Sequence, residues 1–199
     1  MASLTKMMTA LVSLELAKDM RLDIRATYFK VSQKASSTIG TTANLLEGQV
    51  LSIWDLLHGL MLPSGNDAAM VLAENFTDRL VKLGNRSMHK ELNSASTPIK
   101  APEGGVGAFV KVMNKTARRI HMRATNYANP HGLADKSNHS TALELAYLAN
   151  FAMKNDTFRQ IVNTKSFTSI NYLPMKRCRR LPNYEFETWH TYQDRDIPF

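Results

Sequence analysis

A serine and a lysine near the start of the sequence have the types and the spacing of a nucleophile and its base. Ser3 and Lys6 stand at positions i and i+3 of a predicted helix, so their side chains share one face. A serine hydroxyl needs a base to remove its proton, and burial or the positive end of a helix dipole lowers a lysine pKa enough for that role. The spacing is common, however, and in isolation an N-cap serine beside a solvated lysine explains it better.

A second polar cluster, Ser64-Gly65-Asn66, is predicted to form a loop between two helices. A hydroxyl in that loop can pass a proton between the lysine and a leaving group. The Asn66 carboxamide can orient the lysine or bind a substrate amide. In isolation a turn with helix-capping residues is again the better interpretation, but the two clusters together favour catalysis.

The histidines offer little support for other chemistry. None of the six has a metal-binding spacing such as His-Glu-x-x-His. His131 lies in a Pro-His-Gly turn, where we expect a structural role or a place at the edge of a cleft rather than a general base.

Composition excludes several classes of protein. The chain has 199 residues, of which 44% are hydrophobic and 21% charged, so it is expected to fold as about one domain. No apolar run is long enough to span a membrane, and the single Cys178 excludes an internal disulfide framework. The net charge of +8 gathers partly at 118–123 and 176–180. Solvated basic faces explain it better than a nucleic-acid site, because no groove-binding element or aromatic platform accompanies them.

Hydrophobic spacing and capping residues predict a helix-rich chain with few short strands. Ser52 with Asp55, and Thr141 with Glu144, have the spacing of capping boxes. Asp67 is expected to cap the helix that follows the Ser64 loop. Beyond residue 173 no clear periodicity remains. The predicted helices span 3–18, 53–61, 67–83, 106–120 and 142–154, with a short helix ending at 162, a strand over 166–172 and a polar loop over 86–105.

Several segments match the pattern of one known family. The first two read ASLTKMMTA and LPSGNDAA, and the segments in order are 2–10, 62–69, 109–114, 124–126, 129–133 and 140–142. Over about residues 2–170 the chain resembles the serine D-alanyl-D-alanine carboxypeptidases, which are low-molecular-mass penicillin-binding proteins. The resemblance implies an α+β fold of the β-lactamase/transpeptidase-like superfamily.

The resemblance also implies a role for each polar residue identified above. Ser3 is implied as the acylated nucleophile, Lys6 as its general base, and Ser64 and Asn66 as the proton relay and the substrate contacts. In the implied reaction, Ser3 attacks the carbonyl between the two terminal D-alanines of a peptidoglycan stem peptide, D-alanine leaves, and water frees the acyl-enzyme. β-Lactams are implied to acylate the same serine. No metal or other cofactor is implied, and the implied location is extracytoplasmic, although the first residues do not read as a signal peptide.

One motif of the family is absent from the sequence. No Lys-Thr-Gly occurs, and Lys115-Thr116-Ala117 lies within a predicted helix rather than on a strand. In the family that strand binds the substrate carboxylate and supplies an oxyanion-hole donor, so we expect the chain alone to be weak or inactive. Only two residues precede Ser3 and the sequence ends at Phe199. We therefore expect mainly the helical lobe of the fold, with most of the antiparallel sheet missing at both ends.

These observations divide the chain into two expected parts. Residues 1–172 are expected to form a partial carboxypeptidase-like catalytic domain with an insertion loop at 86–105, and residues 173–199 a basic, aromatic segment that diverges from the family. Three explanations stay open. The chain is a truncated carboxypeptidase, or one piece of a split protein whose partner covers the missing sheet, or a catalytically inactive relative that serves as a scaffold or complex subunit. Nucleic acid is not favoured as a partner.

Overall fold

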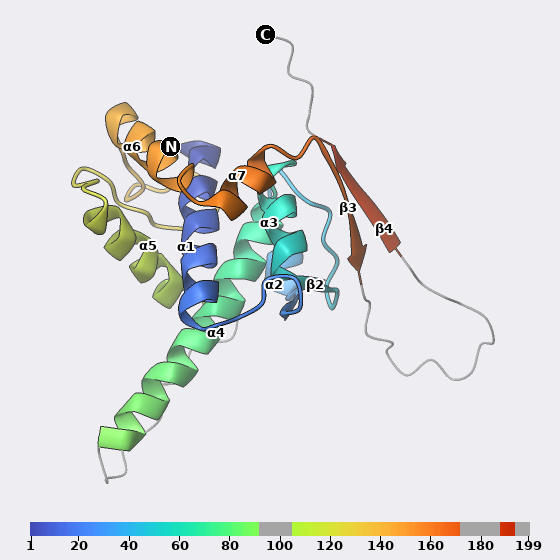
Figure 1. Ribbon diagram of the computed structural model, residues 1–199, viewed down its shortest axis with the longest axis horizontal. Helices are drawn as coiled ribbons and strands as arrows, with labels where there is room; N and C mark the ends of the chain where they lie inside the picture. The colour runs from blue at the N-terminus through green and yellow to red at the C-terminus, as the bar shows by residue number, and fades with distance from the viewer. Residues whose placement is uncertain (92–104, 172–187, 194–199) are drawn as a thin grey trace, which may run out of the picture.

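The computed structural model, which describes residues 1–91, 105–171 and 188–193, is built around one buried helix, α1 (Figure 1). This helix is apolar or small on nearly all sides, with Met8, Leu11 and Val12 almost fully buried, so it must be enclosed by other elements. Helices α3 to α7 all contact or neighbour it and supply that enclosure. The helices are α1 (Thr5–Asp19), α2 (Gln33–Ser36), α3 (Ile53–Met61), α4 (Asn66–Glu91), α5 (Gly107–Arg119), α6 (Ala142–Ala152) and α7 (Asp156–Val162), with a 3-10 turn, η1 (Ala2–Leu4), before α1.

The described strands form two separate antiparallel pairs. In the first, β1 (Tyr28–Lys30) pairs with β2 (Val50–Ser52). In the second, β3 (Ser166–Asn171) pairs with β4 (Thr188–Gln193) and lies on the opposite side of α1 from α5 and α6 (Figure 1). Strand β4 falls where the sequence showed no periodicity. Within the described ranges, no helix combines the length and apolarity that a bilayer crossing requires.

Three phenylalanines tie the first strand pair to the helices. Phe29 of β1, Phe76 of α4 and Phe109 of α5 are all fully buried. The ring centroids of Phe29 and Phe76 lie 5.1 Å apart in an edge-to-face arrangement, and those of Phe76 and Phe109 lie 6.2 Å apart. Aromatic pairs of this geometry stabilise a core beyond their buried area. The helices around α1 and the first strand pair therefore share one core.

The predicted loop over 86–105 is wrong at its start, because α4 continues to Glu91. Gly84 lowers helix propensity by only about 1 kcal/mol, and no proline follows before Pro98, so nothing in the sequence ends the helix near Leu83. Residues 92–104 of the predicted loop lie outside the described residues, and its status as an insertion stays a prediction.

The two predicted capping boxes have different outcomes. Ser52 accepts from the backbone N–H of Asp55, whose carboxylate in turn accepts from the Ser52 backbone, which confirms the box at α3. Thr141 caps α6 by accepting from the Glu144 N–H, but the Glu144 carboxylate binds the Ala124 backbone instead. The second prediction is therefore only half correct, because Thr141 caps the helix but the Glu144 carboxylate accepts from the backbone of another segment.

Candidate active site

The predicted nucleophile and base meet at the start of α1. Ser3 lies in the 3-10 turn and Lys6 in the first turn of the helix, and the Lys6 Nζ is 3.3 Å from the Ser3 Oγ. Lys6 is only 2% exposed, whereas Ser3 is open to solvent. An exposed hydroxyl above a buried amine is the arrangement that a serine nucleophile needs.

Ser64 reaches the same point from the loop between α3 and α4. Its hydroxyl donates to the Ser3 Oγ at 2.9 Å, across 61 positions of sequence. Its backbone φ is 59°, in the left-handed region that residues with a side chain rarely adopt. Strain of this kind persists where surrounding contacts enforce it. Here Thr41 donates to the Ser64 carbonyl at 2.6 Å, and the Gly65 N–H donates to the Gly59 carbonyl at 3.0 Å.

Burial lowers the pKa of Lys6 from 10.5 to about 8, while the Asp67 carboxylate opposes part of that shift. A pKa of about 8 makes the neutral amine a few hundred times more abundant at pH 7 than it is for a solvated lysine. The ammonium form is not left unsatisfied, because Nζ also donates to the His131 carbonyl at 2.8 Å. Lys6 is therefore held in place and able to accept a proton.

The segment that carries His131 packs directly onto the start of α1. Thr9 donates to the Pro130 carbonyl at 2.6 Å. Gly132 has a φ of +88°, and a Cβ there would lie 1.9 Å from the Ala2 carbonyl oxygen, so only glycine allows this approach. Burial, aided by the Lys6 charge, lowers the pKa of His131 to about 4. The ring is therefore neutral at pH 7, and its Nδ1 accepts from the Leu133 N–H. His131 contributes its backbone carbonyl to the site, a contact that the sequence did not indicate.

Asn66 and Asp67 fix the loop rather than the lysine. The Asn66 amide donates to the Ile39 carbonyl at 2.7 Å, and no hydrogen bond joins it to Lys6, Ser3 or Ser64. Its predicted substrate contact stays a prediction. Asp67 is not the N-cap of α4, which begins at Asn66; its carboxylate accepts from the backbone N–H groups of Ala43, Leu45 and Ala68 and from the Thr42 hydroxyl. These bonds tie the beginning of α4 to the segment before β2.

The three groups that converge can carry out acyl transfer. Ser3 Oγ contacts a hydroxyl and an amine, and both can relay its proton. Ser3, Lys6 and Ser64 thus lie within direct hydrogen-bond distance, as the sequence predicted. Their chemical roles stay predictions.

Comparison with known proteins agrees with this geometry. Residues 1–90 and 92–186 match the family model of the S11 peptidases, described as D-alanyl-D-alanine carboxypeptidase. The chain belongs to this family. A D-alanyl-D-alanine carboxypeptidase of Streptomyces sp. (strain K15) is 34% identical over 168 residues, which cover 84% of this chain and 50% of that protein. The chain thus spans about half the length of this relative.

Solved structures extend the likeness to the fold. The crystal structure of the Streptomyces K15 DD-transpeptidase superposes with a TM-score of 0.69 at 28% identity, covering 97% of this chain and 63% of that one. A D-alanyl-D-alanine carboxypeptidase DacD from Francisella tularensis gives 0.66 at 29% identity, covering 84% of this chain and 34% of that one. This S11 chain therefore has the β-lactamase/transpeptidase-like fold, and the part of it that the structure describes is mainly helical.

Proposed function

We propose that the chain is a serine D-alanyl-D-alanine carboxypeptidase that acts on peptidoglycan stem peptides through an acyl-enzyme on Ser3. One observation carries the proposal: the Ser3 Oγ lies 2.9 Å from the Ser64 Oγ and 3.3 Å from the Nζ of the buried Lys6. Family membership supports the substrate class, and it also supports an extracytoplasmic location and reaction with β-lactams.

The contacts supply each proton transfer of the reaction. Neutral Lys6 takes the Ser3 proton as Ser3 Oγ bonds to the carbonyl carbon of the penultimate D-alanine. The bond from that carbon to the terminal nitrogen then breaks, and Ser64 passes a proton to the departing D-alanine amine and regains one from Lys6. Water then attacks the ester carbonyl while Lys6 accepts a proton from it. The ester bond to Ser3 Oγ breaks, the shortened peptide leaves, and Ser3 regains its proton.

The polypeptide of residues 1–199 is proposed to perform this reaction weakly when alone. It contains no Lys-Thr-Gly, the motif that in the family binds the substrate carboxylate and supplies an oxyanion donor. Loss of one such donor lowers the rate by about 10²–10³-fold. Poorer positioning of the substrate adds to that loss.

Labelling with a fluorescent penicillin tests the proposal. Two proteins are compared. The first is residues 1–199, and the second is a chimera that adds to this chain the segments of the Streptomyces relative with which it does not align. We expect faint labelling of the first and strong labelling of the second, both abolished by Ser3→Ala. A second readout is D-alanine release from a peptide ending in D-alanyl-D-alanine. Labelling that survives Ser3→Ala contradicts the assignment of the nucleophile.

A catalytically inactive scaffold is the second candidate function, and the missing Lys-Thr-Gly is the observation that favours it. The chimera separates the two functions. If it melts cooperatively yet shows no Ser3-dependent labelling, the Ser3 site is not competent and the scaffold is supported. A split protein, whose partner would supply the rest of the sheet, is a separate alternative from the scaffold and stays a proposal.

A further inference from the structure

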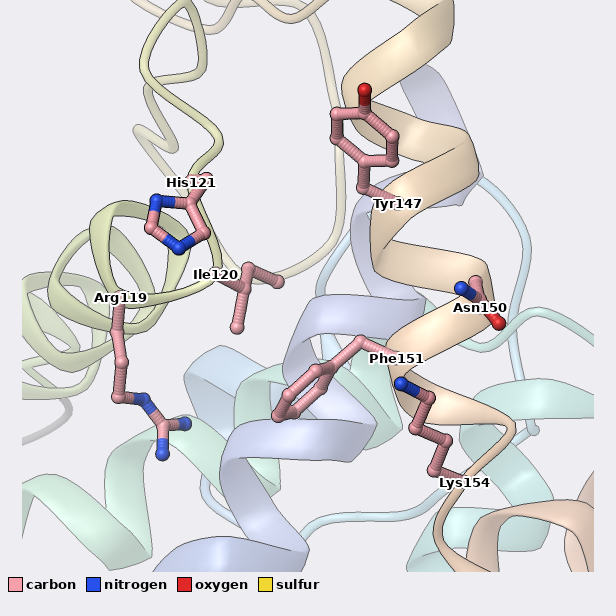
Figure 2. A pocket seen from close by; sticks show the side chains of 7 residues that line it. All are labelled: Arg119, Ile120, His121, Tyr147, Asn150, Phe151 and Lys154. Atoms are coloured by element: carbon pink, nitrogen blue, oxygen red, sulfur yellow. The ribbon is translucent and has the colours of Figure 1, made fainter.

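A hollow separates the end of α5 from α6, and none of the residues that line it belongs to the Ser3 site. Its volume of about 300 Å³ is at the lower end for small-molecule sites, large enough for a single sugar ring. Figure 2 shows Arg119, Ile120 and His121 on one side and the α6 side chains on the other. The other side is formed by Tyr147, Asn150 and Phe151 of α6 and by Lys154, which lies two residues beyond the end of that helix.

The hollow has a cationic side chain that no acidic group neutralises. Lys154 is exposed and makes no ion pair with the described residues, and the same holds for His121. Arg119 differs, because its Nη2 lies 2.5 and 2.6 Å from the two Glu15 carboxylate oxygens. That pair fixes the guanidinium at the rim and leaves Lys154 as the free positive charge. A ligand with an anionic group is the natural complement of such a charge.

Aromatic rings and an amide complete the lining. Tyr147 is 47% exposed although it lies on a helix that packs against α1, and Phe151 is half-buried beside Arg119, whose guanidinium carbon is 5.9 Å from the ring centroid. An aromatic face covers the apolar C–H face of a sugar ring. The exposed Asn150 amide offers both a donor and an acceptor to ring hydroxyls.

His121 occupies a position where a helix usually has glycine. The Met122 N–H donates to the Ala117 carbonyl at 2.9 Å and the His121 N–H to the Arg118 carbonyl, which is the hydrogen-bond pattern of a Schellman motif. The residue at its left-handed position is His121, with a φ of 65°. Glycine adopts that φ without a steric penalty, so the imidazole at the mouth of the hollow is not required for the end of the helix. Arg21 holds the same position at the end of α1 with a φ of 53°, so His121 is set apart by its place at the hollow and not by its φ.

We propose that the hollow between α5 and α6 binds a saccharide that carries a phosphate or a carboxylate. Lys154 contacts the anionic group, Tyr147 covers the sugar ring, and His121 and Asn150, which Figure 2 shows away from Lys154, bind hydroxyls. The proposal does not rest on the acylation of Ser3, and its test uses binding alone.

Titration with four probes, followed by isothermal calorimetry and amide chemical shifts at low salt, tests the proposal. The probes are glucose 6-phosphate, glucuronate, glucose and inorganic phosphate. We expect the two anionic sugars to bind with a dissociation constant below about 5 mM and at least tenfold more tightly than glucose or phosphate. If only the sugar phosphate binds, the anion is a phosphate; if only glucuronate binds, it is a carboxylate. Either result keeps the proposal. Equal binding of phosphate and glucose 6-phosphate, or binding of none of the probes, overturns it.

Three variants locate the site. Lys154→Gln and Tyr147→Ala are each expected to weaken the anionic sugars about tenfold, whereas Lys30→Gln, the same charge removal on β1, leaves them unchanged. His121→Gly is expected to weaken binding without lowering the melting temperature, because glycine suits the left-handed position. Binding that persists in both Lys154→Gln and Tyr147→Ala overturns the location. A His121→Gly variant with lower stability and unchanged binding overturns the role of the imidazole.

Discussion

Lys6 is the residue whose protonation state should govern the rate of acylation. Burial lowers its pKa to about 8, and only the neutral amine can accept the Ser3 proton. We therefore predict that the rate of penicillin acylation of the chimera rises with pH along a curve centred near 8. Stopped-flow or quenched-flow labelling between about pH 6 and 10 measures it.

Lys6→Arg is the control for this pH profile, because a guanidinium stays charged throughout that range. The variant is expected to lose nearly all acylation and to show no rise with pH. A profile of unchanged shape in Lys6→Arg would mean that another group is the base.

The residues of the site show where sequence reasoning stops. The shared face of Ser3 and Lys6 follows from helical spacing, and the loop position of Ser64 follows from the flanking helices. The bond from Lys6 to the His131 carbonyl does not, since the two residues lie 125 positions apart and any residue type supplies a carbonyl. Asn66 shows the converse: its type indicates chemistry, but the fold uses its amide to hold the Ile39 carbonyl.

The turn at Gly132 should be essential for docking its segment on α1. In Gly132→Ala the added Cβ would lie 1.9 Å from the Ala2 carbonyl oxygen, at a φ of +88°. We predict a loss of about 3 kcal/mol in the free energy of unfolding, together with slower acylation because the start of α1 shifts. Urea unfolding and penicillin labelling measure the two effects.

Gly84 provides the matched control for that substitution. It lies inside α4, and a Cβ there would meet nothing within 4 Å. Gly84→Ala is therefore expected to stabilise the protein by about 0.5–1 kcal/mol, because alanine favours the helix. If both alanines have the same effect, the close approach at Gly132 is not what restricts that position.

Two histidines with lowered pKa values, the buried His58 and the half-buried His131, should make the packing of the elements sensitive to acid. His58 of α3 stacks on Phe167 of β3 at 3.8 Å between centroids, and burial lowers its pKa, although the nearby Asp55 carboxylate opposes the shift and Arg25 adds to it. The pKa of His131 falls to about 4. A histidine in the unfolded chain has a pKa of about 6.5. Below that pH the unfolded state binds protons that the native state does not bind, so the free energy of unfolding falls as the pH falls.

The measurement is the urea unfolding free energy at about pH 7.5 and 5. Between these values wild type is expected to lose more stability than the double variant His58→Phe/His131→Asn, which lacks both imidazoles. Equal losses in the two proteins would show that the histidines carry none of the pH dependence.

Some elements were predictable and others were not, for local reasons. Ser52 and Asp55 fixed the start of α3 because a capping box needs only neighbouring residues. The end of α4 was misplaced because Gly84 is a weak terminator. Strand β4 was missed because a six-residue strand is defined by its partner, here β3, more than by its own pattern, although its threonines and aromatics favour strands.

At the scale of the whole molecule, Phe76 should be a critical core residue. It is fully buried and contacts Phe29 of β1 and Phe109 of α5, so it joins three elements. We predict that Phe76→Ala lowers the free energy of unfolding by about 3–5 kcal/mol, through lost burial and the cavity left behind. Calorimetry of Phe76→Ala should show a single unfolding transition of this core at a lower temperature than in wild type. Leu143→Ala, at a residue that is 61% exposed on α6, is the control and should change little.

The site at Ser3 is assembled from three distant stretches of chain, so acylation of Ser3 can report the fraction of molecules that are natively folded. Ser64 lies 61 positions from Ser3, and the His131 carbonyl lies 125 positions from Lys6. A partly folded chain can keep helix α1, but it cannot bury the amine or bring the second hydroxyl to the first. Only natively folded molecules should therefore become acylated at Ser3. In a graded urea series, the labelled fraction should follow the tertiary near-ultraviolet signal.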